Sequence, residues 1–485
     1  MIILSVITTI CICVSLFVVA PGNWVPIAAV SLLPFIIWLL TTDTGRLVYL
    51  LILLIPVSVP QGIIEGFVIG FPSEALGVAL LLFMLIASAV NKRQGRSFYK
   101  HPLVVLMIVE VLWMVFCAVT SVDPAVGLKR VFMRFLFLQL YFFYGIRLFT
   151  NNKSGYHLLH ILYATGLLIP ITSAIIFHSK FDFIPPAAYK MCSPYYADHT
   201  IYGASIAFVI PMLLVLTFGN RTIQLKRLLH TFVVLLTVVT VTAVVLSFSR
   251  AAWVSLIVSG FFALLIRLRI SLRGLLAMLT VIGITVYVYN DDLFSYISKN
   301  DAISNKGDIS DHLLSATNVQ SDASNTERIN RWVCAWKIAT ERPLTGCGPG
   351  MYQFTYGKYQ ETFRMTRIST FSGNRGHAHS EFFTQLSETG FPGGLLFIVI
   401  VLTSIGYGLK VIYQEKKKRL RLLLYGTVIG LMTFYIHGVF NAFLDTDKMA
   451  VLVFGSLSII VAADIRQRGE KSSGNSTQLD SPGVV

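Results

Sequence analysis

Two histidines and two carboxylates fall close together in residues 376–394, GHAHSEFFTQLSETGFPGG. A neutral imidazole can take a proton from a hydroxyl near neutral pH, so a single histidine of this pair is a candidate general base. The two histidines and Glu381 would also suit a metal ion if the chain were extended there. The spacing of apolar residues in SEFFTQLSETGF predicts a helix instead, on which positions i and i+2 diverge, so a metal site is disfavoured.

The predicted helix is capped by His379 or Ser380, and Glu381 lies in its first turn. The positive end of the helix dipole disfavours imidazolium, so we expect a lowered pKa and a neutral ring for His379. Glu388 lies on the same helix, where it could orient or stabilise a reacting group. An interfacial histidine without a catalytic role is the alternative. The expected buried face comprises Phe382, Phe383 and Leu386.

Arginines that could hold a phosphate precede this stretch. Arg250 lies in SFSRAAW, the predicted tip of an apolar hairpin, where an arginine is costly and is usually functional or paired. Arg328 and Arg331 lie on the polar side of a helix that is predicted to begin at Asn325 or Thr326. Arginines on such an interfacial helix also meet lipid headgroups, which is the alternative for these two. The apolar stripe of the helix comprises Ile329, Trp332, Val333, Trp336 and Ala339.

A cluster of glycines follows this helix, which Pro343 is expected to end. Gly346, Gly348 and Gly350 predict a tight turn. Such a turn could present backbone N–H groups to a phosphate, but a plain helix stop and turn is the simpler interpretation.

The composition indicates the class of protein in which these residues act. The chain has 485 residues, 55% hydrophobic and 13% charged, against about 25% charged in soluble domains. Its net charge of +15 is concentrated in short clusters between apolar runs, as the positive-inside rule predicts for cytoplasmic loops. We therefore expect an integral membrane protein and exclude nucleic-acid binding. The six cysteines show neither metal-site nor disulfide-framework spacing.

Apolar runs of spanning length predict an all-α polytopic membrane protein with 12 to 14 transmembrane helices. The segment 46–60 is short and ends in IPVSVP, so it either spans or only dips into the bilayer. The runs lie near 2–20, 25–41, 74–90, 103–121, 129–147, 157–177, 202–218, 230–248, 251–266, 274–289, 393–412, 422–443 and 447–465.

With the basic loops in the cytoplasm, one large loop with short interfacial helices lies on the extracytoplasmic side. Lys129 and Arg130, with Arg134, then lie at an outer face, so either the boundaries are shifted or they hold an anion. We divide the chain into N-terminal helices (1–200), central helices with the arginine hairpin (201–289), the catalytic loop (290–392), C-terminal helices (393–465) and a disordered cytoplasmic tail (466–485).

Three motifs in this order resemble those of the O-antigen ligase/polymerase superfamily. His379-Ser380, nine residues and Gly390-x-x-Gly393 match the signature H-[NSQ]-x9-G-x-x-G. SRAAW lies upstream, followed by Arg328 and Trp332 in R-x-x-x-W before PLTGCGPG. The resemblance covers roughly residues 200–460.

The resemblance implies an inverting GT-C glycosyltransferase that uses a glycan on undecaprenyl pyrophosphate, with no metal and no cofactor. It implies that His379 activates an acceptor hydroxyl while Arg250, Arg328 and Arg331 hold the pyrophosphate. Bidentate arginine contacts could neutralise the leaving group without a metal. His377, Lys129, Arg130, Gly346 and Gly348 are further candidate contacts.

The first function that the resemblance implies is O-antigen ligation to lipid A–core at the periplasmic face of a bacterial inner membrane. A polymerase that extends another lipid-linked repeat unit, or a protein O-oligosaccharyltransferase, would use the same site. A polysaccharide transporter is the alternative of a different class. It is disfavoured because the predicted spans hold few charged residues at mid-depth. Asp198 and His199 are expected to cap a helix, and His437, Asp445, Asp447 and Lys448 to form an interfacial ion-pair cluster or acceptor contacts.

Overall fold

The computed structural model describes residues 44–64, 67–90, 97–152, 155–183, 188–269, 323–365, 369 and 376–479. In these ranges the chain is helical apart from one β-hairpin, which confirms the all-α polytopic fold. Nine of the described helical segments are long and apolar enough to span a membrane. The predicted spans 2–20, 25–41 and 274–289 and most of the polar stretch 291–325 lie outside the described residues. The total of 12 to 14 helices stays a prediction.

The described helices agree closely with the predicted runs between residues 74 and 465. One predicted span, near 129–147, consists of two α-helices joined by a turn of π-helix. The α-helices are α3 (Thr44–Leu54), α4 (Ser73–Val90), α5 (Pro102–Val119), α6 (Pro124–Phe137), α7 (Tyr144–Asn151), α8 (Leu158–Ser179), α9 (Ala188–Met191), α10 (His199–Phe218), α11 (Asn220–Ile223), α12 (Arg227–Leu246), α13 (Arg250–Arg267), α17 (Ala323–Glu341), α18 (Tyr352–Thr355), α19 (Glu381–Gln414), α20 (Lys418–His437) and α21 (Asp447–Leu479); the shorter turns are η1 (Ile55–Val57), η2 (Ser97–Lys100), η3 (Leu138–Phe143), η6 (Tyr356–Tyr359) and η7 (Thr362–Arg364).

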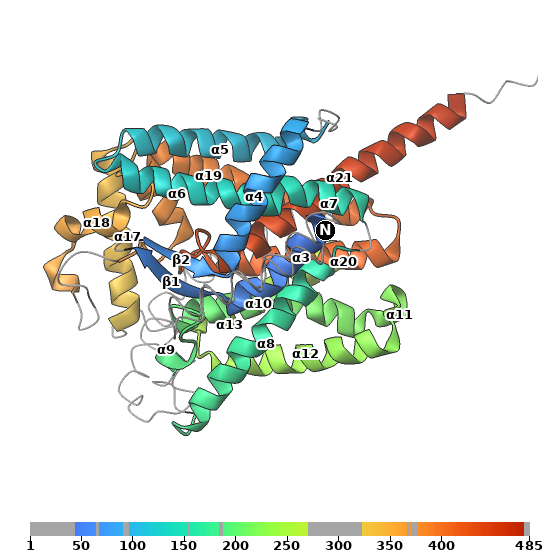
Figure 1. The fold of residues 1–485 in the computed structure, drawn as a ribbon, viewed down its shortest axis with the longest axis horizontal. Coiled ribbons are helices and arrows are strands. Elements are labelled where there is room, and N and C mark those ends of the chain that lie inside the picture. The colour runs from blue at the N-terminus through green and yellow to red at the C-terminus, as the bar shows by residue number, and fades with distance from the viewer. Residues whose placement is uncertain are drawn as a thin grey trace, which may run out of the picture.

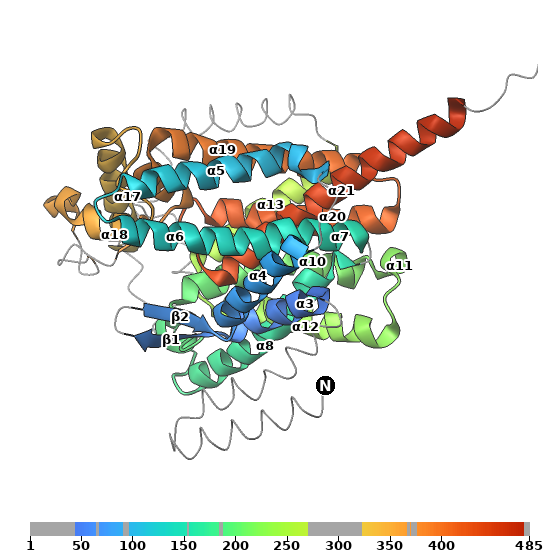
Figure 2. The ribbon, with the colours of Figure 1, turned by 45° about the horizontal axis from the view of Figure 1, so that its top comes forward.

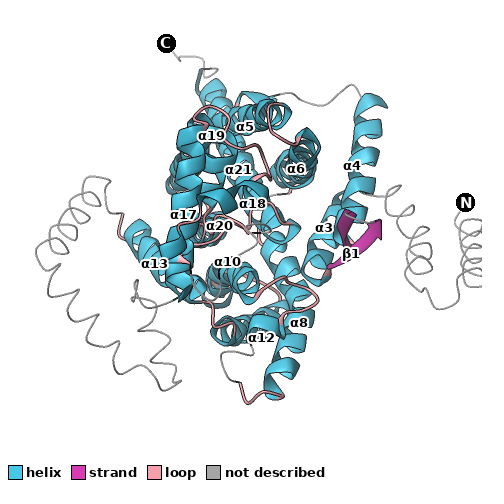
Figure 3. Cartoon of the chain, turned by 90° about the vertical axis from the view of Figure 1, so that its left-hand side faces the viewer, coloured by secondary structure: helices cyan, strands magenta, loops and turns pink. Residues whose placement is uncertain are grey.

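The long helices form one bundle. In Figures 1 and 2, α5, α6 and α19 run side by side, and α17 lies across the end of the bundle where α19 begins. The short helix α11 and the far end of α21 lie at the opposite end. Figure 3 looks at the end that carries α17 and α18, with the other helices seen behind them. The loop helices therefore cover one end of the bundle.

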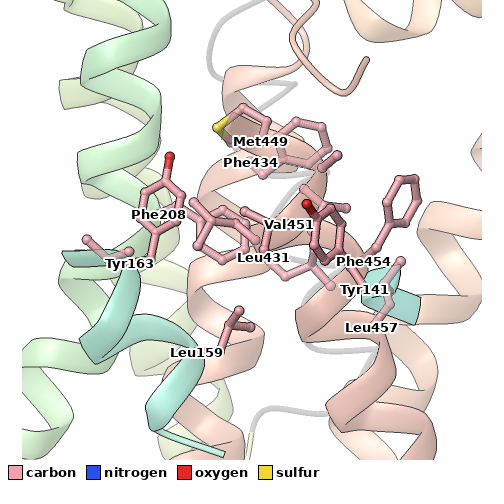
Figure 4. Close-up of a cluster of buried hydrophobic side chains, with 14 of the residues drawn as sticks. Tyr141, Leu159, Tyr163, Phe208, Leu431, Phe434, Met449, Val451, Phe454 and Leu457 are labelled. Carbon is pink, nitrogen blue, oxygen red and sulfur yellow. The ribbon is translucent and has the colours of Figure 1, made fainter. Parts of the chain in front are cut away.

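The core of the bundle is centred on α21. Of its most apolar stretch 94% is buried, against 22% for α13, whose apolar side chains mostly face outward. Figure 4 shows buried side chains of α8, α10, α20 and η3 packed around those of α21. Phe208, Phe434 and Phe454 are among them, each less than 5% exposed. This packing fixes the ends of α10, α20 and α21 relative to one another.

The segment 46–60 is not among the described helices that are long enough to span a membrane. α3 ends at Leu54, and after η1 the chain forms an antiparallel hairpin of β1 (Val59–Ile64) and β2 (Phe67–Phe71), which the sequence did not predict. Asp447 at the start of α21 accepts hydrogen bonds from Ser58 (3.0 Å) and Ser73 (2.5 Å). Lys448 Nζ donates to the carbonyl of Ser58 at 2.8 Å. These partners are far apart in sequence, so no local pattern revealed them.

The predicted disordered tail is wrong in its first part, because α21 continues to Leu479. Ion pairs support this extension beyond residue 465. Arg468 Nε lies 2.6 Å from Asp464 Oδ2, one turn earlier, and Arg466 pairs with Glu415. Pairs spaced i,i+4 stabilise exposed helix ends.

α19 is broken at Gly390. This residue has φ 70° and ψ −175°, so Glu381–Thr389 forms a separate short helix before the spanning part. The predicted helix and the predicted span are therefore both confirmed, with the break at the first glycine of the signature. A Cβ at Gly390 would overlap the carbonyl of Leu344, and the N–H of Phe391 donates to Pro343 O at 2.8 Å. The break lets the loop after α17 approach the backbone of α19.

We predict that Gly390→Ala lowers stability, because alanine disfavours this φ and its Cβ has no room. The strained backbone alone should cost about 1–3 kcal/mol. Gly406→Ala on the same helix is the matched control: a Cβ there has nothing within 4 Å. Thermal unfolding in detergent should show a lower Tm for Gly390→Ala and an equal or higher Tm for Gly406→Ala. Equal Tm values for the two variants would contradict this account.

Candidate functional site

The glycine turn after α17 binds the end of the short helix of α19. Gly346, Gly348 and Gly350 all have positive φ, as the turn prediction requires. The N–H of Gly346 donates to Arg342 O at 2.9 Å, and that of Gly348 to Glu388 O at 3.0 Å. Contrary to the phosphate interpretation, both N–H groups are used within the protein.

Glu388 supplies the anion that this turn holds. Its carboxylate accepts from the N–H of Gly350 at 2.8 Å and from the N–H of Tyr352 at 3.4 Å. The side chain is buried. It also lies two helical turns, or about 10 Å along the axis, from the start of α19. The carboxylate of Glu388 is thus held by backbone N–H groups of the glycine turn, and its role in orienting or stabilising a reacting group stays a prediction.

The short helix buries its polar side. Ser387, Glu388 and Gln385 are buried, whereas the expected buried face of Phe382, Phe383 and Leu386 is only partly covered. The expectation for that face is wrong, because the helix of a membrane protein need not turn its apolar side toward the protein interior. Apolar side chains can meet lipid, while polar groups need partners inside the protein.

His377 and His379 lie side by side just before α19. Their ring centroids are 4.0 Å apart, and the N–H of His379 donates to His377 Nδ1 at 3.2 Å. His379 has φ 50°, a left-handed conformation that is uncommon for a residue with a side chain. Trp332 Nε1 donates to the carbonyl of His379 at 3.2 Å and its ring stacks on Phe383. The backbone of His379 is thus held on two sides, by Trp332 of α17 and by the ring of His377.

Burial holds the pKa of His379 well below its ordinary value, and the neighbouring charges of His377, Arg328 and Arg331 act in the same direction. Burial also lowers the pKa of His377, with Arg331 and Arg328 adding to the effect and Asp198 opposing it. Both rings are therefore neutral near pH 7. The direction expected for His379 is correct, but its cause is burial and nearby cations, rather than the helix dipole that was proposed.

Arg328 lies within electrostatic range of four histidines. It is close enough to act electrostatically on His377 and His379, on His199 at the start of α10, and on His437 at the end of α20. Arg250 also acts on His199. The structure therefore brings the two predicted phosphate-binding arginines, from α13 and α17, to the same imidazole.

Arg331 is enclosed by the protein. Its Nε lies 2.7 Å from Glu327 Oε1, and its guanidinium carbon lies 3.9 Å from the centroid of the Tyr356 ring. The side chain is only 3% exposed, and a Cβ at Gly376 would overlap it. The polar side of the helix, on which Arg331 was predicted, is buried at this point, because Arg331 pairs with Glu327 one turn earlier. Its contacts hold the loop that leads to His377.

Arg130 and Arg134 of α6, the cations predicted at an outer face, are paired with carboxylates of the protein. Arg130 lies 2.9 Å and Arg134 lies 2.7 Å from the carboxylate of Asp445, and Arg134 also lies 3.4 Å from Glu110. Burial alone would raise the pKa of Asp445, but the two arginines hold it below its ordinary value. The anion at this position is thus a side chain of the protein. Lys129 is exposed beside them.

The residues noted near other helix ends divide between structure and site. Asp198 caps α10, accepting from the N–H of Thr200 at 2.7 Å, as expected. Asp445, like Asp447 and Lys448, is bound within the protein, in agreement with the ion-pair interpretation. His199 and His437 instead lie within electrostatic range of Arg328. The sequence predicted an ion-pair cluster or acceptor contacts for His437 and a helix cap for His199, and no local pattern placed either residue near Arg328.

The described residues contain no group of three or more His, Cys, Asp or Glu side chains arranged to hold a metal ion. The four described cysteines, Cys117, Cys192, Cys334 and Cys347, are free and buried.

We predict that Asp445→Asn destabilises the protein, because it leaves Arg134, only 1% exposed, without its nearer carboxylate. Breaking a buried ion pair typically costs about 3–5 kcal/mol. Glu341→Gln removes one carboxylate from an exposed pair with Lys358 and is the matched control. Chemical denaturation in detergent should separate the two variants, and an Asp445→Asn protein as stable as the control would refute the assignment.

Comparison with known proteins agrees with this arrangement. Residues 232–398 match a family model described as O-antigen ligase. The matched region contains Arg250, Arg328, His379 and Gly390. A search of curated proteins found no match.

Proposed function

Because residues 232–398 place the chain in the O-antigen ligase family, we propose that it transfers a glycan from undecaprenyl pyrophosphate to an acceptor hydroxyl. Its most specific form would be ligation of O-antigen to lipid A–core. The observation that carries the proposal is the position of His379, a neutral imidazole within electrostatic range of Arg328 at the end of a membrane bundle. The family match supports ligase- or polymerase-type chemistry in general, and ligation is the form that we propose first.

In the proposed reaction, His379 takes the proton of the acceptor hydroxyl. The oxygen then forms a bond to the anomeric carbon as the bond from that carbon to the pyrophosphate oxygen breaks on the opposite face. The configuration is thereby inverted, and the electron pair leaves on the pyrophosphate. A neutral base is required at the first step, and the low pKa of His379 provides it.

Arg328 and Arg250 are the proposed pyrophosphate contacts. Guanidinium groups bind phosphoryl oxygens through two parallel hydrogen bonds and stabilise the charge that develops on the leaving group. Two such cations would make a metal unnecessary for this step. Lys129 and Arg130, at the adjacent end of α6, are proposed to attract the anionic donor.

The remaining predicted residues receive positioning roles in this proposal. His377 accepts from the backbone of His379 and so helps to hold its left-handed conformation. Glu388 and the turn of Gly346 and Gly348 fix the short helix of α19 against α17. Arg331 fixes the approach of the loop from residue 376.

We propose that the site faces the periplasm across a bacterial inner membrane. α11, in the basic stretch RTIQLKR, lies at the end of the bundle opposite α17 (Figures 1 and 2). Basic loops are retained in the cytoplasm. A bundle end that is remote from them would lie where lipid-linked glycans are displayed after export.

We predict that His379→Ala lowers turnover by about 10²–10⁴, the usual contribution of a general base. Purified protein in detergent receives a glycan on undecaprenyl pyrophosphate and lipid A–core, and release of undecaprenyl pyrophosphate is measured. His230→Ala, at the cytoplasmic start of α12, is the matched control and should keep full turnover. Unchanged turnover in His379→Ala would reject the assignment.

The same pair of variants in a deletion strain identifies the acceptor class. A lost ligase leaves full-length glycan that is not attached to lipid A–core. A lost polymerase leaves single repeat units on the core, which would replace ligation by polymerisation in this proposal. The His230→Ala strain should make the normal glycan ladder in either case.

A further inference from the structure

His437 is a buried histidine that the proposed reaction does not yet use. It is the last residue of α20, and only 2% of it is exposed. Its Nδ1 is buried and has no hydrogen-bond partner within the described part of the chain. A buried polar atom without a partner costs free energy, so such atoms in native proteins call for an explanation.

The other ring nitrogen of His437 fixes the position of its proton. Nε2 lies 3.0 Å from the amide nitrogen of Asn441, one turn further along the chain. An amide nitrogen can only donate, so Nε2 accepts. The ring is therefore neutral, and its single proton is on Nδ1. Asn441 is itself only 2% exposed and holds this tautomer in place.

The backbone next to His437 is bound to the start of α19. The carbonyl of Gly438 accepts from the N–H of Glu381 at 2.7 Å and from Ser380 Oγ at 3.3 Å. The carboxylate of Glu381 in turn accepts from the N–H of Leu444 at 2.6 Å and from that of Phe443. The end of α20 is thus fixed directly beside the residue that follows His379-Ser380.

Two charged groups near His437 suggest which kind of atom could accept a hydrogen bond from its Nδ1–H. Arg328, a proposed pyrophosphate contact, lies within electrostatic range, as does Asp198 at the cap of α10. An oxygen that binds Arg328 would lie near a neutral donor with a fixed direction. A neutral donor adds a hydrogen bond there without adding another positive charge beside Arg328.

We propose that His437 is a further substrate-binding residue, whose Nδ1–H donates a hydrogen bond to a phosphoryl oxygen of the lipid pyrophosphate. The proposal rests on the proposed function, because it names a second contact for the same leaving group. Asn441 is a positioning residue that keeps the proton on Nδ1. A purely structural role for His437, packing its ring 5.7 Å from Phe443, would need no proton at this position.

Two variants of His437 that differ in the position of their amide nitrogen distinguish the substrate-binding role from a purely structural one. His437→Asn puts an N–H donor near the position of Nδ1, whereas His437→Gln puts it near that of Nε2. We expect His437→Gln to raise the KM for the undecaprenyl-pyrophosphate donor by about 10- to 100-fold, the effect of one lost hydrogen bond to a charged group. His437→Asn should stay within about threefold of wild type, since a hydrogen bond to the same oxygen remains. The KM for the lipid A–core acceptor should not change in either variant.

Asn441→Ser provides a second test that leaves His437 in place. It releases the tautomer and should raise the donor KM in the same direction, with an unchanged Tm in detergent. Binding of undecaprenyl pyrophosphate alone, measured by protection against thermal unfolding, should follow the same order. Equal donor KM values for His437→Asn and His437→Gln, or a change confined to the acceptor KM, would overturn the inference. The proposed reaction would not be affected by that result, because His379→Ala tests it separately. Wild-type protein without turnover would instead overturn the proposed function and this inference with it.

Discussion

The arrangement depends on the burial of polar groups along the first two turns of α19. In a membrane protein, apolar side chains can face lipid at no cost, whereas polar groups must find partners within the protein. Glu381 and Glu388 find theirs in backbone N–H groups, of residues 443–444 and of residues 350 and 352. One short helix thereby connects the loop after α17 with the loop between α20 and α21. His379 lies immediately before this helix.

The cations at this end of the bundle then serve two purposes. Arg130, Arg134 and Arg331 are held by carboxylates and hold the fold together. Arg328 and Arg250 lie among the histidines and are the proposed contacts of the leaving group. This division explains how a strongly basic region remains stable, because buried arginines require matched carboxylates. It also keeps the positive field near His379, where it favours the neutral imidazole.

Local patterns in the sequence predicted the features that depend on nearby residues. Hydrophobic runs gave the described spans, Asp198 the cap of α10, and Pro343 with the three glycines the turn after α17. The sequence also predicted a short helix before the span near 393–412, and the structure adds that the positive φ of Gly390 separates the two. Each of these depends on a few consecutive residues and on the allowed backbone angles.

The features that the sequence did not predict depend on partners far along the chain. The Arg134–Asp445 contact joins residues 311 positions apart, and Ser58–Asp447 joins residues 389 apart. The burial of Arg331 was not predicted, because Tyr356 and Gly376, which cover it, lie further along the chain. The nearness of His199 and His437 to Arg328 was not predicted for the same reason, since only the packing of α10 and α20 brings them within its electrostatic range. The positions of carboxylates relative to arginines such as Arg134 are set by tertiary packing, so no local pattern reveals them.

The most direct test of the central claim is a cryo-electron microscopy map of the protein with an unreacted lipid-pyrophosphate glycan bound. The account predicts pyrophosphate density between Arg328 and Arg250, with His379 still left-handed and its ring facing the anomeric carbon. Pyrophosphate bound away from both arginines, or a His379 ring turned away from the sugar, would contradict it.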